Sequence, residues 1–222
     1  IMKIKSAVVG MGKMGLLHSS ILSSFDDVEF VGIADTNKFI LNSFRQIKPD
    51  WKYYNNYIDL INDNELDLVF ITTPIFSHAE IIGECIKNNI SFFVEKPAVA
   101  KVSQIENIIK MNRDSLSNAV GYMMRYVPTF SKGKRLITNS IIGKINSIQA
   151  KMYISQLFKA GKGWRYDPHV SGGGVIIHQT CHVIDLLNWY FGFPHKVSSI
   201  TKNWYSKDVE DYAHIIMEFK NG

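Results

Sequence analysis

Apolar residues in the first half of the chain gather in short runs that alternate with segments of helical periodicity. The run over 66–74 is almost continuously apolar, which is typical of a parallel strand covered on both faces. Strand and helix alternate with short connections, so the pattern predicts a doubly wound parallel α/β sheet over residues 1–121. The expected strands are 3–10, 28–35, 66–74 and 90–97, and the expected helices are 13–25, 38–47, 77–89 and 102–114.

The pattern changes after residue 121, where strand–helix alternation gives way to longer loops and alternating strands. The expected elements are a helix over 127–142, a strand over 143–155, a glycine-rich loop over 158–174, a helix over 175–191 and strands over 195–206 and 211–222. We therefore expect a second, α+β domain over 122–222 with a largely antiparallel open sheet. This sheet has no closing element before residue 222, so we expect it to be truncated there.

One apolar helix carries a polar stripe that burial alone does not explain. His178, His182 and Asp185 are spaced i, i+4 and i+7, so an α-helix places them on one face, with Trp189 on the same line. These groups either satisfy each other inside a core or line a binding site. The two imidazoles also have the spacing of zinc ligands, but the glutamate of an H-E-x-x-H motif is missing, so we expect no metal.

Composition restricts the classes of function. The 222 residues carry a formal net charge of +5, and the basic residues are scattered, without the dense face that binds nucleic acid. No apolar stretch reaches the roughly 18 residues of a membrane span. Cys85 and Cys181 lie in apolar helical text and predict buried thiols in a reducing compartment. No signal peptide is recognisable, and we expect a cytoplasmic protein without nucleic-acid or membrane partners.

A glycine-rich turn joins the first expected strand to the first expected helix. Its glycines have the G-x-G-x-x-G spacing, and Asp35 ends the second strand 20 residues after the last of them. Here a helix N-terminus attracts a pyrophosphate, and the carboxylate accepts a hydrogen bond from a ribose 2′-hydroxyl. The motif predicts a Rossmann domain that binds NAD, with NADP disfavoured because Asp35 would repel a 2′-phosphate. The turn consists of Gly10, Met11, Gly12, Lys13, Met14 and Gly15.

Two further segments follow strands at the edge of the sheet where ligands bind in this fold class. The first, T-T-P-I-F-S-H, runs from Thr72 to His78, and the second, E-K-P, runs from Glu95 to Pro97. By position alone, the histidine and the lysine could equally be solvated side chains or functional groups.

Together these motifs resemble the glucose–fructose oxidoreductase and inositol dehydrogenase (Gfo/Idh/MocA) family. The resemblance rests on the glycine turn, T-T-P-I-F-S-H, E-K-P and a later W-R-Y-D-P…S-G-G-G…H…H-V-I-D-L-L segment, in this order. It implies an NAD(P)-dependent oxidoreductase that moves hydride between nicotinamide and a secondary hydroxyl of a sugar, polyol or nucleotide-linked sugar. It also implies a second domain whose open sheet mediates a homo-oligomer, a dimer or a tetramer.

The resemblance further implies roles for individual residues. Lys96 and His182 match the catalytic pair: the lysine works beside the nicotinamide, and the histidine exchanges a proton with the reacting hydroxyl. Trp164 and Arg165 match a pair near cofactor and substrate. Arg125 matches the arginine of an N-x-R segment in which Met123 here replaces asparagine. The positions that match cofactor-lining residues are Thr72, Thr73, Pro74, His78, Glu95 and Lys96.

The sequence departs from the family at His178, where many members have aspartate. We expect the polar stripe to form the substrate wall, with His178 contacting substrate and Asp185 orienting His182 or capping a backbone group. Without the aspartate, His182 is expected to transfer the proton near neutral pH, with Lys96 as hydrogen-bonding partner or relay. The departure and the short chain also leave an alternative, a catalytically inactive NAD-binding regulator or subunit of the same fold.

Overall fold

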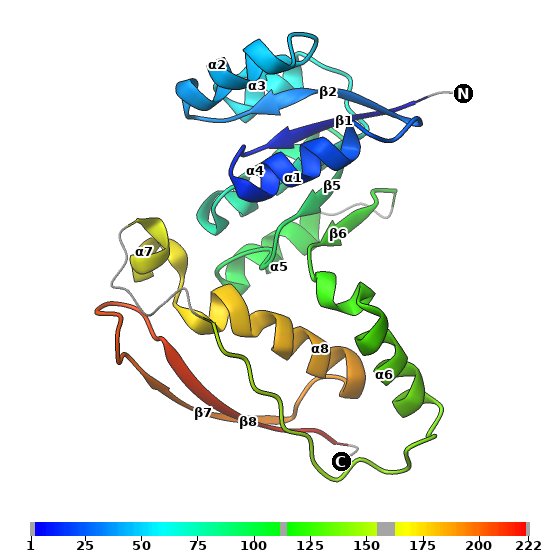
Figure 1. Ribbon diagram of the computed structural model, residues 1–222, viewed down its shortest axis with the longest axis vertical. Helices are drawn as coiled ribbons and strands as arrows, with labels where there is room; N and C mark the ends of the chain where they lie inside the picture. The colour runs from blue at the N-terminus through cyan, green and yellow to red at the C-terminus, as the bar shows by residue number, and fades with distance from the viewer. Residues whose placement is uncertain (1–2, 112–114, 155–162, 221–222) are drawn as a thin grey trace. The chain divides into compact units, whose positions relative to one another are not determined.

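The structure is a computed structural model that describes residues 3–111, 115–154 and 163–220. The chain divides into two compact units, Ile1–Gly121 and Tyr122–Gly222, and each unit has its own sheet (Figure 1). Within the described ranges, no helix is both long and apolar enough to cross a membrane.

The first unit is built on a six-stranded sheet in the order β3-β2-β1-β4-β5-β6, in which every pair is parallel. The order reverses between β1 and β4, which is where open α/β sheets bind ligands at the carboxyl ends of their strands. The doubly wound sheet predicted from the sequence is thereby confirmed. The strands are β1 Ile4–Val9, β2 Val28–Ala34, β3 Lys52–Tyr54, β4 Leu68–Ile71, β5 Ser91–Val94 and β6 Asn118–Val120.

Both faces of this sheet are buried beneath helices. Val8 and Val9 of β1 belong to different apolar clusters, because successive side chains of a strand point to opposite faces. One cluster includes Ile81 of α4, and the other includes Leu41 of α2. The helices are α1 Lys13–Leu22, α2 Lys38–Ile47, α3 Tyr57–Asn62, α4 His78–Lys87 and α5 Val102–Met111, with a 3-10 turn, η1, at Ile75–Ser77.

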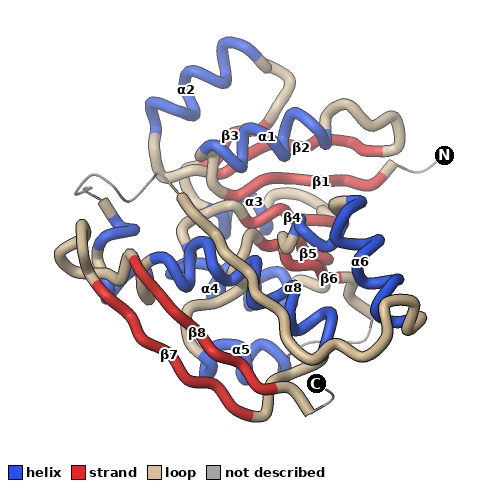
Figure 2. Tube along the Cα trace, turned by 60° about the horizontal axis from the view of Figure 1, so that its bottom comes forward, coloured by secondary structure: helices blue, strands red, loops and turns tan. Residues whose placement is uncertain are grey.

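The second unit combines helices with an antiparallel pair of strands. β7 and β8 are hydrogen-bonded to each other in antiparallel orientation (Figure 2). Lys196 lies opposite Glu218 at one end of the pair, and Lys202 lies opposite Tyr212 at the other end. This pairing confirms the expected antiparallel strands, and α6 packs against α8. The elements are η2 Met123–Tyr126, α6 Pro128–Thr138, η4 Trp164–Tyr166, α7 Pro168–Ser171, η5 Ile176–Thr180, α8 Cys181–Phe191, β7 Lys196–Lys202 and β8 Tyr212–Glu218.

Two sequence predictions for the second unit are wrong. No strand forms over 143–154, the described part of the strand expected over 143–155; these side chains are mostly exposed, and alternation without a partner strand does not make a sheet. The loop expected over 158–174, of which 158–162 lie outside the described residues, contains the short helix α7. Pro168 at its first position and the Asp167 carboxylate, which accepts from the His169 amide, start this helix.

Candidate functional site

The glycine turn connects β1 to α1 at the carboxyl edge of the first sheet, and two of its glycines are required by the protein itself. Gly10 has φ +95°, and a Cβ there would lie 2.8 Å from the Thr73 amide nitrogen. A Cβ on Gly15 would lie 1.9 Å from the Gly10 carbonyl oxygen. Helix and strand can approach this closely only because both positions lack a side chain.

Gly12 differs from its two neighbours in the motif. Its φ is −72°, which any residue adopts, and apart from its chain neighbours no atom of the described residues lies within 4 Å of the position that a Cβ would take. It caps the N-terminus of α1, and as a glycine it has no side chain to accept a hydrogen bond from the first amides of the helix. Packing within the chain does not account for a glycine at this position, whereas close approach of an anionic ligand to exposed amides does. The turn therefore fits a dinucleotide phosphate.

Asp35 directly follows β2, and its side chain connects the end of β2 to the glycine turn that follows β1. Its carboxylate oxygens accept hydrogen bonds from the backbone amides of Met11, at 2.6 Å, and of Asn37, at 2.7 Å. The side chain is half-buried, and each oxygen retains a lone pair for a further donor. Sequence reasoning did not anticipate the contact with Met11, which holds the carboxylate beside the turn.

The segment after β4 is fixed largely by its own side chains. Thr72 donates from Oγ1 to the Gly10 carbonyl at 2.6 Å, and Ser77 donates to Oγ1 of Thr73 at 2.8 Å. His78 is almost fully buried, with Nε2 2.8 Å from the Thr73 carbonyl oxygen and Nδ1 3.1 Å from the Pro97 carbonyl oxygen. Burial lowers the pKa of His78, although its backbone carbonyl neighbours oppose the shift. Its ring thus joins the loops after β4 and β5.

The segment after β5 contains Glu95 and Lys96. The carboxylate of Glu95 contacts His18 of α1, with Nε2 3.1 Å from Oε1. Sequence reasoning missed His18; the available signal was its place three residues after Gly15, near the face of α1 that packs on the sheet. The cofactor-lining positions predicted in this unit thus gather at the carboxyl edge of one sheet, next to the strand-order reversal.

In the second unit, Arg125 binds Asp185, the carboxylate of the polar stripe. Its guanidinium donates two hydrogen bonds to the Asp185 carboxylate, one of them from Nε at 2.7 Å, and it lies 5.9 Å from the centre of the Trp189 ring. Asp185, which we expected to orient His182 or cap a backbone group, therefore binds an arginine. The hydrogen bond to Asp185 raises the pKa of Arg125.

Aromatic side chains meet the two histidines of the stripe. The Trp164 ring lies edge-on to His178 at 5.4 Å between centres, and Arg165 lies over Trp164 at 4.6 Å. His182 is buried, and Tyr122, which sequence reasoning did not select, lies edge-on to it at 6.1 Å. The structure thus brings the W-R pair to His178 and the segment containing Arg125 to Asp185 in the middle of α8.

The helix itself is not uniform. The α-helix expected over 175–191 begins instead with a π-helical segment, Ile176–Thr180, which contains His178, and continues as α8 from Cys181. A π-turn is wider than an α-turn, so His178 does not keep the strict i, i+4 alignment with His182 that the sequence implied. Such turns are frequent at functional sites.

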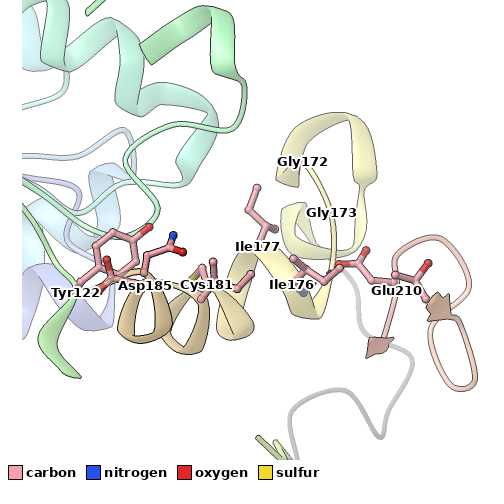
Figure 3. Close-up of a pocket in the computed structure, with 11 residues that line it drawn as sticks. Tyr122, Gly172, Gly173, Ile176, Ile177, Cys181, Asp185 and Glu210 are labelled. Atoms are coloured by element: carbon pink, nitrogen blue, oxygen red, sulfur yellow. Dashed lines mark hydrogen bonds between the residues drawn. The ribbon is translucent and has the colours of Figure 1, made fainter. Parts of the chain in front are cut away.

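A cavity of about 510 Å³ lies beside this helix in the second unit. Figure 3 shows Tyr122 and Asp185 toward one end of the cavity and Glu210 toward the other. Glu210 accepts hydrogen bonds from the amides of Gly174 and Ile176, at 2.7 and 3.0 Å. Burial raises the pKa of Tyr122 to about 12, so its hydroxyl stays protonated. The other lining residues are Gly172, Gly173, Ile176, Ile177, Cys181, Ile184, Asn188 and Thr201.

Family models match both parts of the chain. Residues 4–120 match the model described as oxidoreductase family, NAD-binding Rossmann fold, and residues 130–222 match the GFO/IDH/MocA C-terminal domain. The chain belongs to the Gfo/Idh/MocA family. Its first unit is therefore an NAD-binding Rossmann domain, as the glycine turn and Asp35 predicted.

Relatives with assigned names include two inositol dehydrogenases. Myo-inositol 2-dehydrogenase of Thermotoga maritima is 25% identical over 85% of this chain and 55% of the relative, and oxidoreductase P35 of Formosa agariphila is 29% identical over 73% and 52%. Inositol 2-dehydrogenase of Salmonella typhimurium is 25% identical over the whole chain and 65% of the relative. The chain thus spans between about half and two thirds of the length of these relatives.

Solved structures of the same fold include two with bound ligands. The WlbA dehydrogenase of Bordetella pertussis, in complex with NADH and UDP-GlcNAcA, has a TM-score of 0.89 at 21% identity, covering the whole chain and 67% of that structure. Levoglucosan dehydrogenase in complex with NADH and levoglucosan has a TM-score of 0.86 at 21% identity, covering the whole chain and 65% of that structure. These likenesses show a shared fold.

Proposed function

We propose that the protein is an NAD-dependent oxidoreductase that acts on a secondary hydroxyl of a sugar or polyol. The observation that carries the proposal is Gly12, because its missing side chain opens the N-terminus of α1 to an anion and no packing among the described residues requires it. The names of the inositol dehydrogenases and of levoglucosan dehydrogenase support the substrate class.

The first unit, 1–121, holds the cofactor in this proposal. The turn from Gly10 to Gly15 binds the pyrophosphate, and Asp35 accepts from a ribose hydroxyl with the lone pairs that its two backbone contacts leave available. A carboxylate at this position repels a 2′-phosphate, which favours NAD over NADP. The loops that begin at Thr72 and Glu95 line the cofactor.

Bound nicotinamide supplies the hydride donor or acceptor. His182 takes the proton from the substrate hydroxyl, because an imidazole exchanges protons near neutral pH and an ordinary lysine does not. Lys96 donates a hydrogen bond to the same hydroxyl oxygen and orients it. His178 and the Trp164–Arg165 pair contact the substrate, and Asp185 holds Arg125 in place for the same purpose.

The second unit, 122–222, carries substrate contacts and an oligomer surface in this proposal. All seven residues of β7 are exposed, including Val197 and Ile200, and Ile216 of β8 is exposed as well. Burial of such apolar side chains against another copy would stabilise a dimer or tetramer. We further propose that the protein works in the cytoplasm.

The decisive experiment combines cofactor binding with turnover. NADH fluorescence is titrated with the protein, with NADPH as the control, and sugars and polyols are then screened for NAD reduction. We expect tight NADH binding, weak NADPH binding and turnover that Lys96→Ala and His182→Ala each reduce at least about 100-fold. NADH binding without any turnover would support the inactive regulator, and absence of both would overturn the proposal.

A further inference from the structure

Histidines from two different helices contact the residues on either side of Lys96. His18 of α1 has its Nε2 3.1 Å from Oε1 of Glu95, the residue before the lysine. His78, the first residue of α4, has its Nδ1 3.1 Å from the carbonyl oxygen of Pro97, the residue after it. The loop that carries the lysine is therefore held on both flanks.

The contact between His18 and Glu95 is largely buried and closely packed. The two side chains are only 17% and 15% exposed, and the imidazole packs against the rings of Phe70 and Phe93 at 5.2 and 5.0 Å between centres. A Cβ on Gly121 would lie 3.3 Å from Oε2 of Glu95, so the neighbouring strand end leaves room for the carboxylate and little more. The direction of the carboxylate is thereby fixed.

The second oxygen of Glu95 extends this restraint to the next residue. Oε2 accepts from the backbone amide of Lys96 at 3.3 Å, while the amide of Glu95 donates to the Ile71 carbonyl of β4 at 2.9 Å. The backbone of Glu95 is thus anchored to the sheet. Its side chain joins α1 to the lysine amide.

His78 provides the second restraint. Its ring is 1% exposed, and both nitrogens face carbonyl oxygens, so the neutral imidazole, which carries a single N–H, donates to one of the two carbonyls at a time. The contact to Pro97 uses Nδ1 and the contact to Thr73 uses Nε2, so different substitutions can remove one contact and retain the other. The ring joins the lysine loop to the loop that follows β4.

We propose that His18 and His78 are positioning residues that fix the orientation of Lys96. The inference rests on the proposed function, in which Lys96 orients the reacting hydroxyl. A misplacement of a reacting group by about 1 Å can reduce a rate about 100-fold, so a loop restrained on both sides matters for turnover more than for cofactor affinity.

Substitutions that replace one imidazole nitrogen at a time test this proposal. The amide of glutamine approximates the position of Nε2, and the shorter amide of asparagine approximates that of Nδ1. His18→Gln therefore retains a donor for Glu95, and His18→Asn does not reach it. The preference is reversed at the other position, where His78→Asn retains the Pro97 contact and His78→Gln retains only the Thr73 contact.

The expected result is a crossed pattern in kcat. We expect His18→Asn and His78→Gln to lower kcat at least about 10-fold, and His18→Gln and His78→Asn to stay within about 3-fold of the unsubstituted protein. The NADH dissociation constant should change less than about 3-fold in all four variants. If the two histidines had a purely structural role, the substitutions would lower stability. They would not lower kcat while leaving NADH binding unchanged, and the preferred replacement would not change from Gln at His18 to Asn at His78.

A second measurement does not depend on turnover. Hydrogen exchange of the Lys96 amide, measured by NMR on the cofactor-free protein, should accelerate at least about 10-fold in His18→Asn and recover in His18→Gln. The Glu95 amide, which donates to the Ile71 carbonyl, is the control and should not change. Equal kcat for Asn and Gln at both positions, or unchanged Lys96 exchange in His18→Asn, overturns the inference. NADH binding without turnover by the unsubstituted protein overturns the proposed function instead, and the exchange data then decide the positioning.

Discussion

Arg125 and Asp185 form a two-point hydrogen-bonded ion pair between the segment after the first unit and the middle of α8. The carboxylate is largely buried, whereas the guanidinium side chain is 41% exposed and also lies over Trp189. Two parallel N–H donors fix the plane of the carboxylate as well as its charge. This arrangement explains why a carboxylate lies on a helix that is mostly apolar.

Removal of the arginine is expected to destabilise the second unit. Arg125→Ala leaves a buried carboxylate without its partner and should cost about 1–3 kcal/mol, less than the penalty in a fully buried pair because the arginine is partly exposed. Arg125→Lys should lose less, since it keeps the charge but not the two-point geometry. Thermal unfolding of both variants measures this, and equal stability of Arg125→Ala and the unsubstituted protein would contradict it.

The glycines of the turn provide a matched pair for separating binding from folding. Gly12→Ala should raise the NADH dissociation constant at least about 10-fold and change the free energy of unfolding by less than about 1 kcal/mol, because no described residue beyond its chain neighbours lies near the Cβ position. Gly15→Ala should destabilise the first unit by about 3 kcal/mol or more, because its Cβ would overlap the Gly10 carbonyl. Titration and denaturant unfolding measure both effects. If Gly12→Ala binds NADH normally, the cofactor assignment of this turn fails.

His78 should make the first unit less stable at mildly acidic pH. Burial lowers its pKa below the ordinary value of about 6.5, so the unfolded chain binds a proton more readily than the native protein does. The free energy of unfolding should therefore fall as the pH drops below about 6.5 toward the lower pKa of the native state, with a slope of at most about 1.4 kcal/mol per pH unit from this one group.

Asparagine cannot titrate in this range, so His78→Asn removes the contribution of that group. Chemical unfolding of both proteins at several pH values should give a shallower pH dependence for the variant. Parallel curves for the two proteins would show that His78 does not titrate differently in the native and unfolded states.

The two cysteines should differ in reactivity. Burial raises the pKa of Cys85 to about 12, which leaves about one thiolate in ten thousand at pH 8, while Cys181 is only partly buried. In the native protein a disulfide reagent should therefore modify at most Cys181, and Cys181→Ser should react only after unfolding. Rapid modification of Cys85 in that variant would show that the core around α4 opens readily.

The first unit was predictable because its signals are local and repeated. The apolar run over 66–74 contains β4, and the glycine spacing marked the turn before α1. The short strand β3 and helix α3 were not anticipated, because three and six residues are too few to establish a period. The ends of the longer elements also differ from the predicted ones by several residues, because periodicity identifies an element better than it marks the residue where that element begins or ends.

The site was less accessible to sequence reasoning, because its contacts join distant segments. The pairs His18–Glu95 and Arg125–Asp185 are separated by 77 and 60 residues, so no local spacing links them. The π-helical segment around His178 differs from an α-helix in hydrogen bonding rather than in its pattern of apolar residues. Residues 143–154 show the opposite error, since their alternation did not produce a strand.

The uneven distribution of buried side chains has a consequence for every measurement of stability. Both apolar clusters lie within residues 7–120, whereas the buried apolar side chains among the described residues of the second unit are Leu186 and Val209. The second unit should therefore melt first, in a separate step, and a single melting temperature would not describe the protein. Of the four tryptophans, Trp51 alone belongs to the first unit, so tryptophan fluorescence mainly reports on the second unit. On heating, the change in far-ultraviolet circular dichroism, which reports on both units, should therefore occur at higher temperature than the change in fluorescence.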